Sequence, residues 1–152
     1  MTLLILGLVL FLGAHTFTTL RQLRQPAIAR LGEGPYKGLY SLVSAAGIVL
    51  IVIGFGRYRH AGYIAIWDPP PGLHAVTLIL MWVSFVSLAA AYSPLGKIKA
   101  SLRHPMLVGV KAWALAHLIA NGDLGSILLF GGFLAWAVYD RISLKQIGRA
   151  HV

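Results

Sequence analysis

Cysteine is absent from this chain of 152 residues, and acidic residues are scarce. The lack of cysteine excludes disulfides, thiolate metal ligands and a cysteine nucleophile. The chain has only four acidic residues, which are Glu33, Asp68, Asp123 and Asp140. No two of them are spaced as a catalytic acid/base pair. A proton relay inside a membrane also lacks its usual carboxylates. The glycines form no phosphate-binding fingerprint, so nucleotide chemistry of that kind is not indicated.

Charge of either sign is also sparse, at 11% of residues against about 25% in a typical soluble domain. Hydrophobic residues make up 58% of the chain, and the mean hydropathy is +0.78. Because so little charge cannot coat a water-facing globule, the sequence predicts an integral membrane protein. The formal net charge is +9. Basic loops that anchor membrane helices explain it better than nucleic-acid binding, since no basic run is interleaved with aromatic residues.

Five apolar segments predict an all-α, polytopic bundle of transmembrane helices: residues 1–20, 38–56, 72–92, 105–120 and 124–139. Residues 21–37 read as a polar loop. The last two segments are shorter than the roughly 20 residues of a full crossing. No basic residue precedes the first segment, and it has no small-x-small cleavage site, which favours a retained span over a signal peptide.

Lysine and arginine alternate between successive connections. The connections after the first, third and fifth segments contain most of the basic residues: Arg21, Arg24, Arg30, Lys37, Lys97, Lys99, Arg103, Arg141 and Lys145. Those after the second and fourth carry only Arg57 and Arg59. The positive-inside rule therefore predicts an N-terminus outside and the richer loops in the cytoplasm.

The fourth apolar segment contains two groups that are costly in hydrocarbon, Lys111 and His117. An ionisable residue inside a span is a functional-site hypothesis by default. Pro105 suits a first helical turn, and Asn121-Gly122-Asp123 is a stop signal. A stripe of small residues lets a neighbouring helix come close, which predicts a central position for this helix: Ala112, Ala116 and Ala120.

The last six residues, 147–152, can be encoded by the opening codons of a common sequencing adaptor. We therefore expect a single transmembrane domain over residues 1–146, an artefactual tail over 147–152, and a sixth span missing at the C-terminus.

The sequence resembles the NnrU family of bacterial membrane proteins linked to denitrification. The resemblance runs through Lys145 and is most specific in five stretches: Leu10–His15, Arg30–Leu42, Ala91–Pro94, Lys97–Lys99 and Arg103–Asp123. It implies the bacterial inner membrane as the location. That family is in turn similar to ζ-carotene isomerase, a membrane enzyme that contains haem b.

This resemblance implies a haem b held by His15 and His117, which match the two histidines proposed as haem ligands in the isomerase. The isomerase also has a cysteine three residues before the second histidine. Ala114 stands there in this chain, which speaks against cysteine-dependent isomerase chemistry. Asn121, one turn after His117, is a candidate to orient the histidine ring. Lys111 is a candidate partner for a haem propionate, or its ammonium group snorkels to the interface.

The spacing along the chain is compatible with two histidines binding one iron. His15 lies six residues before Arg21, or about 9 Å of helix, and His117 lies thirteen residues after His104, or about 20 Å. With helix axes roughly 8–10 Å apart, the α-carbons of the two histidines would be about 13 Å apart. That separation suits a metal with a histidine on each side, at metal–nitrogen bonds of about 2 Å.

Three functions follow as alternatives. The first is a haem b membrane protein in nitric oxide and nitrite metabolism, as a redox partner, sensor or assembly factor for the nitrogen-oxide reductase machinery. The second is a haem-dependent isomerase, and the third is a small transporter or channel subunit. The residues identify no substrate and no oligomeric state.

Overall fold

A computed structural model describes residues 1–94 and 96–149, and within them the regular structure is entirely helical. The chain forms two compact units, Met1–Tyr63 and Ile64–Val152. Four of the described helices are long and apolar enough to cross a membrane, and one further apolar helix is shorter. The all-α prediction is therefore confirmed. The exact number of spans and a sixth span stay predictions.

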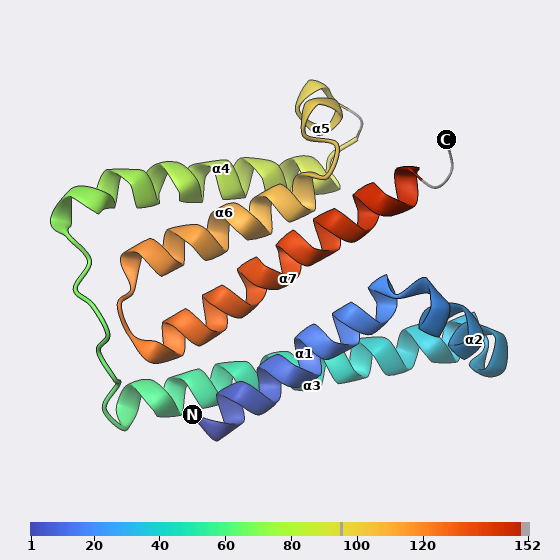
Figure 1. Ribbon diagram of the computed structural model, residues 1–152, viewed down its shortest axis with the longest axis horizontal. Coiled ribbons are helices and arrows are strands. Elements are labelled where there is room, and N and C mark those ends of the chain that lie inside the picture. The colour runs from blue at the N-terminus through green and yellow to red at the C-terminus, as the bar shows by residue number, and fades with distance from the viewer. Residues whose placement is uncertain (95, 150–152) are drawn as a thin grey trace. The chain divides into compact units, whose positions relative to one another are not determined.

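The first unit is a pair of long helices, α1 (Thr2–Thr19) and α3 (Glu33–His60), which lie side by side (Figure 1). A third helix, α2 (Arg21–Leu31), joins them. The prediction of a polar loop over residues 21–37 was therefore wrong. Only Leu20 and Gly32 interrupt the helical run there, and Gly32 has a φ of 84°, a conformation that favours glycine. The second apolar segment also begins earlier and ends later than predicted.

A seam of three glycines, Gly7, Gly47 and Gly54, lets α1 and α3 come into close contact. A Cβ atom on Gly7 would lie 2.6 Å from the Ile51 amide nitrogen, and one on Gly47 would lie 2.9 Å from the Phe11 Cβ. Real Cβ atoms essentially never come so close to other atoms. The glycines thus allow backbone-to-backbone packing of the kind that small residues give membrane helices.

The second unit is a row of three helices, α4 (His74–Tyr92), α6 (Pro105–Ala120) and α7 (Leu124–Arg149) (Figure 1). A 3-10 turn, η1 (Pro71–Leu73), precedes α4, and a short helix, α5 (Lys97–Leu102), separates α4 from α6. α6 packs on both α4 and α7, so the predicted central place of this helix is confirmed within the unit. Ala112 and Ala116 of its small-residue stripe are buried, whereas Ala120 is exposed.

The contact between α4 and α6 is close because Gly109 has no side chain. A Cβ atom there would lie 2.8 Å from the Leu88 Cγ. At the same point the buried Ser84 hydroxyl donates a hydrogen bond of 2.9 Å to the Gly109 carbonyl oxygen. This bond satisfies a polar group that would otherwise be costly among apolar helices.

Two predicted boundaries differ from the structure. The connection after the third apolar segment was predicted as a loop but contains α5. The fifth segment was predicted to end at residue 139, yet α7 continues to Arg149, so its span is not short. No proline or glycine lies between Tyr139 and Gly148, which explains the continuation. Whether residues 147–152 are genuine stays a prediction, and residues 150–152 lie outside the described part.

The turn from α6 to α7 is fixed by a capping residue and a glycine. The Asp123 carboxylate accepts hydrogen bonds from the Ser126 amide at 3.0 Å and from the Ser126 hydroxyl at 2.6 Å, which caps the start of α7. The Ile66 and Trp67 amides donate to the Gly122 carbonyl oxygen at 2.7 and 3.0 Å. A Cβ atom on Gly122 would overlap the Trp67 carbonyl oxygen, so only glycine fits this turn.

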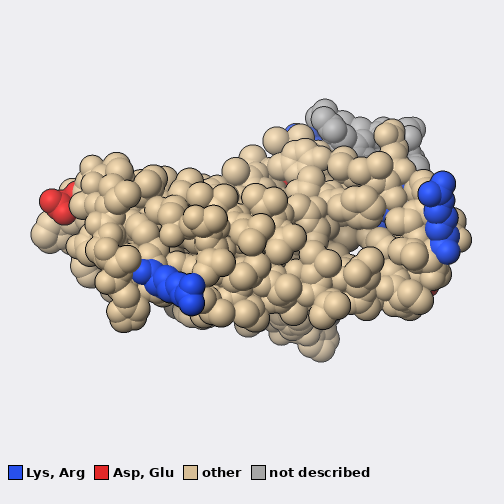
Figure 2. Space-filling model, turned by 90° about the horizontal axis from the view of Figure 1, so that it is seen from below, with Lys and Arg blue, Asp and Glu red and all other residues tan. Residues whose placement is uncertain are grey.

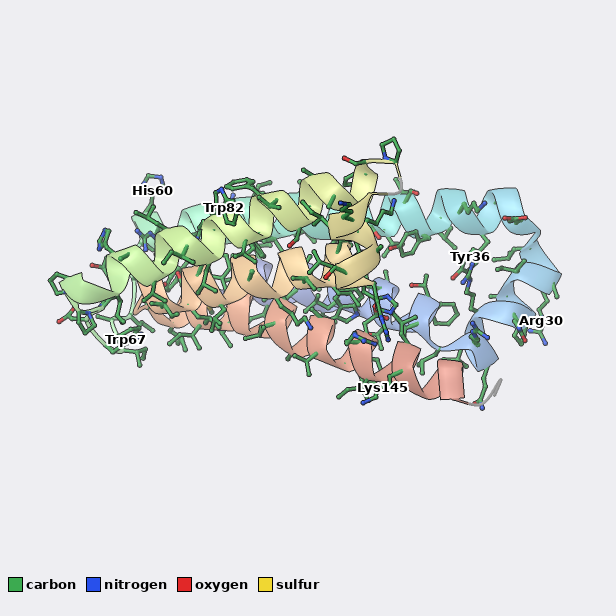
Figure 3. The ribbon with its side chains drawn as sticks, turned by 90° about the horizontal axis from the view of Figure 1, so that it is seen from above. Arg30, Tyr36, His60, Trp67, Trp82 and Lys145 are labelled. Carbon is green, nitrogen blue, oxygen red and sulfur yellow. The ribbon has the colours of Figure 1, made fainter. Side chains whose placement is uncertain are left out.

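The outer faces of the helices are apolar and exposed, as a bilayer requires. Leu42, Leu78 and Trp82 are each about two-thirds exposed, and Trp82 lies on the outer side of α4 (Figure 3). On the face drawn in Figure 2, uncharged residues cover nearly the whole surface. These helices therefore belong in lipid, where exposed apolar side chains carry no cost.

Candidate functional site

His15 lies near the C-terminal end of α1, one turn beyond the Phe11 that packs on Gly47. Its Nδ1 atom is 2.8 Å from the Phe11 carbonyl oxygen. A carbonyl oxygen can only accept, so Nδ1 is the donor, and in the neutral form of the ring Nε2 carries the lone pair. The carbonyl bond also fixes the plane of the ring, as the outer partners of metal-bound histidines do.

Two aromatic rings surround the His15 imidazole. The Phe11 ring centroid is 4.1 Å away, and that of Tyr40 on α3 is 5.3 Å away. Tyr40 also lines a cavity of about 180 Å³ whose wall is mainly apolar and includes Ala14, Phe17, Tyr36, Leu39 and Val43. Arg30 and Tyr36 lie toward the same end of the first unit (Figure 3). His15 is therefore held on the α1–α3 pair, among aromatic side chains, near one end of that pair.

His117 lies in the last turn of α6, and α7 holds its ring. The imidazole stacks flat on Phe130, with centroids 4.3 Å apart and planes 7° apart. Trp113 meets the same imidazole edge-on at 5.4 Å. Trp113 also packs edge-on against Phe130 at 5.0 Å and Phe133 at 5.4 Å. We call Trp113, His117, Phe130 and Phe133 the aromatic cluster.

Ring packing within the aromatic cluster is enough to hold the His117 imidazole in place, so no side-chain hydrogen bond is needed. Trp113 packs against two aromatic rings of α7. The sequence analysis did not identify Phe130 and Phe133. Phe130 and Phe133 are three residues apart in an apolar segment, a spacing that predicts a shared helix face. The spacing does not identify the residue that they contact.

Neither Asn121 nor Lys111 makes a hydrogen bond to the His117 ring among the bonds that the structure describes. The Asn121 side-chain amide donates a hydrogen bond of 2.9 Å to the backbone carbonyl oxygen of His117, at the C-terminal cap of α6. This bond orients the helix end rather than the imidazole. Lys111 is half-buried six residues before His117, so it points about 120° away around the helix. The structure thus links Asn121 to His117 only through the main chain.

The two histidines belong to different compact units, each with its own packing. Within the described residues, no group of three or more His, Cys, Asp or Glu side chains is placed to hold a metal ion. Haem differs from such a centre because the porphyrin supplies four ligands and the protein supplies one or two axial ones. The imidazole of His15 is held by its hydrogen bond to the Phe11 carbonyl oxygen, and that of His117 by its stacking on Phe130.

Comparison with known proteins gives one match. A family model described as NnrU protein matches residues 3–151, nearly the whole chain. No curated protein and no solved structure matches significantly.

Proposed function

This chain belongs to the NnrU protein family, and from that membership we propose that it is a membrane protein that binds haem b through His15 and His117 and acts in denitrification. The observation that carries the proposal is the hydrogen bond from His15 Nδ1 to the Phe11 carbonyl oxygen. In this proposal the bond orients the ring and Nε2 is the nitrogen that binds the iron.

His117 supports the proposal through its packing. Phe130 and Trp113 hold the imidazole from two sides, so a ligand bond would cost little rotational entropy. Their ring faces are apolar, and burial of this kind is one of the means by which a protein sets the potential of a bound haem. A haem held by two histidines supplies one-electron transfer, the kind of chemistry that nitrogen-oxide reduction needs.

Lys111 and Asn121 have supporting roles in this proposal. The Lys111 ammonium group is the proposed partner of a haem propionate, since a half-buried cation inside an apolar helix needs an anion. Asn121 keeps the last turn of α6 closed through its bond to the His117 carbonyl oxygen, and thereby holds the histidine backbone in place.

The isomerase alternative is weaker because of Ala114. This side chain is fully buried and apolar, at the position where the similar isomerase carries a cysteine. An alanine methyl group can neither ligate iron nor exchange with a histidine ligand. No described feature favours a transporter or channel, so we place the nitrogen-oxide role first and propose the bacterial inner membrane, N-terminus outside, as its location.

The test is spectroscopic. The protein is expressed in a host supplied with ample haem precursor, purified, and examined by reduced-minus-oxidised absorption. We expect a Soret band that is lost or shifted in His15→Ala and in His117→Ala. His60→Ala and His104→Ala are matched controls outside the proposed ligand pair and should keep the wild-type band.

Addition of imidazole separates a ligand role from a structural one. In a histidine-to-alanine variant that still folds, exogenous imidazole should restore the low-spin spectrum, because it supplies the missing nitrogen. If both variants retain the wild-type band, the proposed ligands are wrong even though haem is bound.

A further inference from the structure

A cavity of about 510 Å³ lies between the C-terminal turns of α4 and the short helix α5. Its volume is within the range of about 300–1,000 Å³ that is usual for small-molecule sites. The wall is mainly apolar, formed by Val86, Ala89, Ala90, Pro94 and Ile98. The cavity therefore suits a hydrocarbon chain better than a polar ligand.

The position of the cavity along α4 places its mouth at the membrane surface. Residues Pro71–Tyr92 form one of the apolar spans, so the residues after Tyr92 leave the hydrocarbon. Tyr92 is 82% exposed, as expected of a tyrosine at the level of lipid headgroups. Figure 1 shows α5 at this same end of α4. A ligand here would have its polar part at the interface and its apolar part in the cavity.

The charged residues in the connection between α4 and α6 are all positive. Residues 93–104 contain Lys97, Lys99 and Arg103 and no acidic residue. Lys97 lines the cavity and is exposed. The Lys99 ammonium group donates to the carbonyl oxygens of Ala91 at 3.1 Å and Ser93 at 3.0 Å, which ties α5 to the end of α4. Lys99 thus fixes the cavity wall, while Lys97 lies at its rim.

We propose that this cavity binds an anionic phospholipid, with part of an acyl chain among the apolar residues and the phosphate beside Lys97. Basic pockets next to membrane helices recognise anionic headgroups in this way. A zwitterionic lipid would gain less from the positive charge of this connection, and free phosphate would leave the apolar wall unused. The inference does not depend on haem, because the cavity lies at the α4–α5 end of the second unit and includes neither histidine.

The experiment measures lipid binding to the full-length protein purified in mild detergent. Phosphatidylglycerol, phosphatidylcholine and inorganic phosphate are added separately, and binding is followed by native mass spectrometry and by the thermal transition. A ligand that binds the folded state raises that transition. We expect phosphatidylglycerol to bind and stabilise most, phosphatidylcholine less, and phosphate not at all.

Two variants and one control locate the site. Lys97→Gln should weaken phosphatidylglycerol binding about fivefold, the effect expected of one lysine near an anionic headgroup, and leave phosphatidylcholine unchanged. Ala89→Trp, at an exposed position on the cavity wall, should reduce the binding of both lipids by filling the space. Arg30→Gln removes an exposed charge from α2 in the other unit and should behave as wild type.

Several outcomes would overturn the proposal. They are equal binding of the two lipids by the wild type, stabilisation by inorganic phosphate alone, or an unchanged lipid preference in Lys97→Gln. If Ala89→Trp fails to fold, Lys97→Glu provides the second test, because reversal of the charge must abolish the preference for phosphatidylglycerol.

Discussion

Replacement of Gly54 by alanine should separate the two helices of the first unit. A Cβ atom at this position would lie 2.7 Å from the Leu3 carbonyl carbon and closer still to the Leu4 amide nitrogen. Both are backbone atoms of α1, so no side-chain rotation can relieve the overlap. α1 has to move away from α3, and the neighbouring contacts at Gly7 and Gly47 then loosen as well.

The size of the effect follows from two opposing terms. Overfilling a packed contact costs about 1–3 kcal/mol, and a backbone contact belongs at the upper end. Alanine recovers about 1 kcal/mol of helix propensity relative to glycine. The net loss is about 2 kcal/mol, which lowers the thermal transition by roughly 4–8 °C for a protein of this length.

Gly56→Ala is the matched control, two residues further along the same helix. No atom would lie within 4 Å of a Cβ there. This variant should keep or raise the transition temperature by a few degrees, since only the propensity gain of about 1 kcal/mol remains.

The measurement is thermal unfolding in detergent, followed by far-ultraviolet circular dichroism. Tryptophan fluorescence is unsuitable for this unit, because all four tryptophans lie beyond Tyr63: Trp67, Trp82, Trp113 and Trp136. Equal transition temperatures for Gly54→Ala and Gly56→Ala would refute the close glycine contact between α1 and α3.

Three further predictions concern the second unit and the topology. Ala116→Leu should lower stability by about 1–3 kcal/mol, because Ala116 is fully buried on the central helix α6, and an unchanged thermal transition would refute that placement. Asp123→Ala should cost about 0.5–2 kcal/mol through loss of the α7 cap, whereas Asp123→Asn, which keeps an acceptor oxygen, should cost less in the same unfolding assay. A single cysteine at Lys97 in this cysteine-free chain should resist an impermeant thiol reagent added to intact cells, and ready labelling would invert the predicted orientation.

The sequence predicted the class and most of the helices because bilayer-spanning segments have a simple signature. Pro105 and Asn121 marked the two ends of α6 almost to the residue. α2 escaped notice because its polar residues suggested a loop, although only Gly32 separates it from α3. The glycine seam was also missed, since the spacing of Gly47 and Gly54 reveals a close contact only once α1 is known to be the partner.

Part of the candidate site was predictable because an ionisable side chain is easily recognised in an apolar segment. His117 was conspicuous as an ionisable group in an apolar segment, and a family resemblance gave both His15 and His117 a role. Their surroundings were not predictable, because Phe130 comes from the next helix and the Nδ1 bond of His15 depends on the local helix geometry. Asn121 illustrates the limit: its spacing from His117 predicted proximity but could not distinguish the ring from the carbonyl oxygen.

Binding of haem b by two histidines is tested most directly by the haem content of the wild-type protein. The protein is expressed with ample haem and purified, and its haem is quantified against protein by the pyridine haemochrome spectrum. The account predicts one haem b per chain and a low-spin Soret band, the signature of two nitrogen ligands. A folded, monodisperse protein that purifies colourless under these conditions would contradict it.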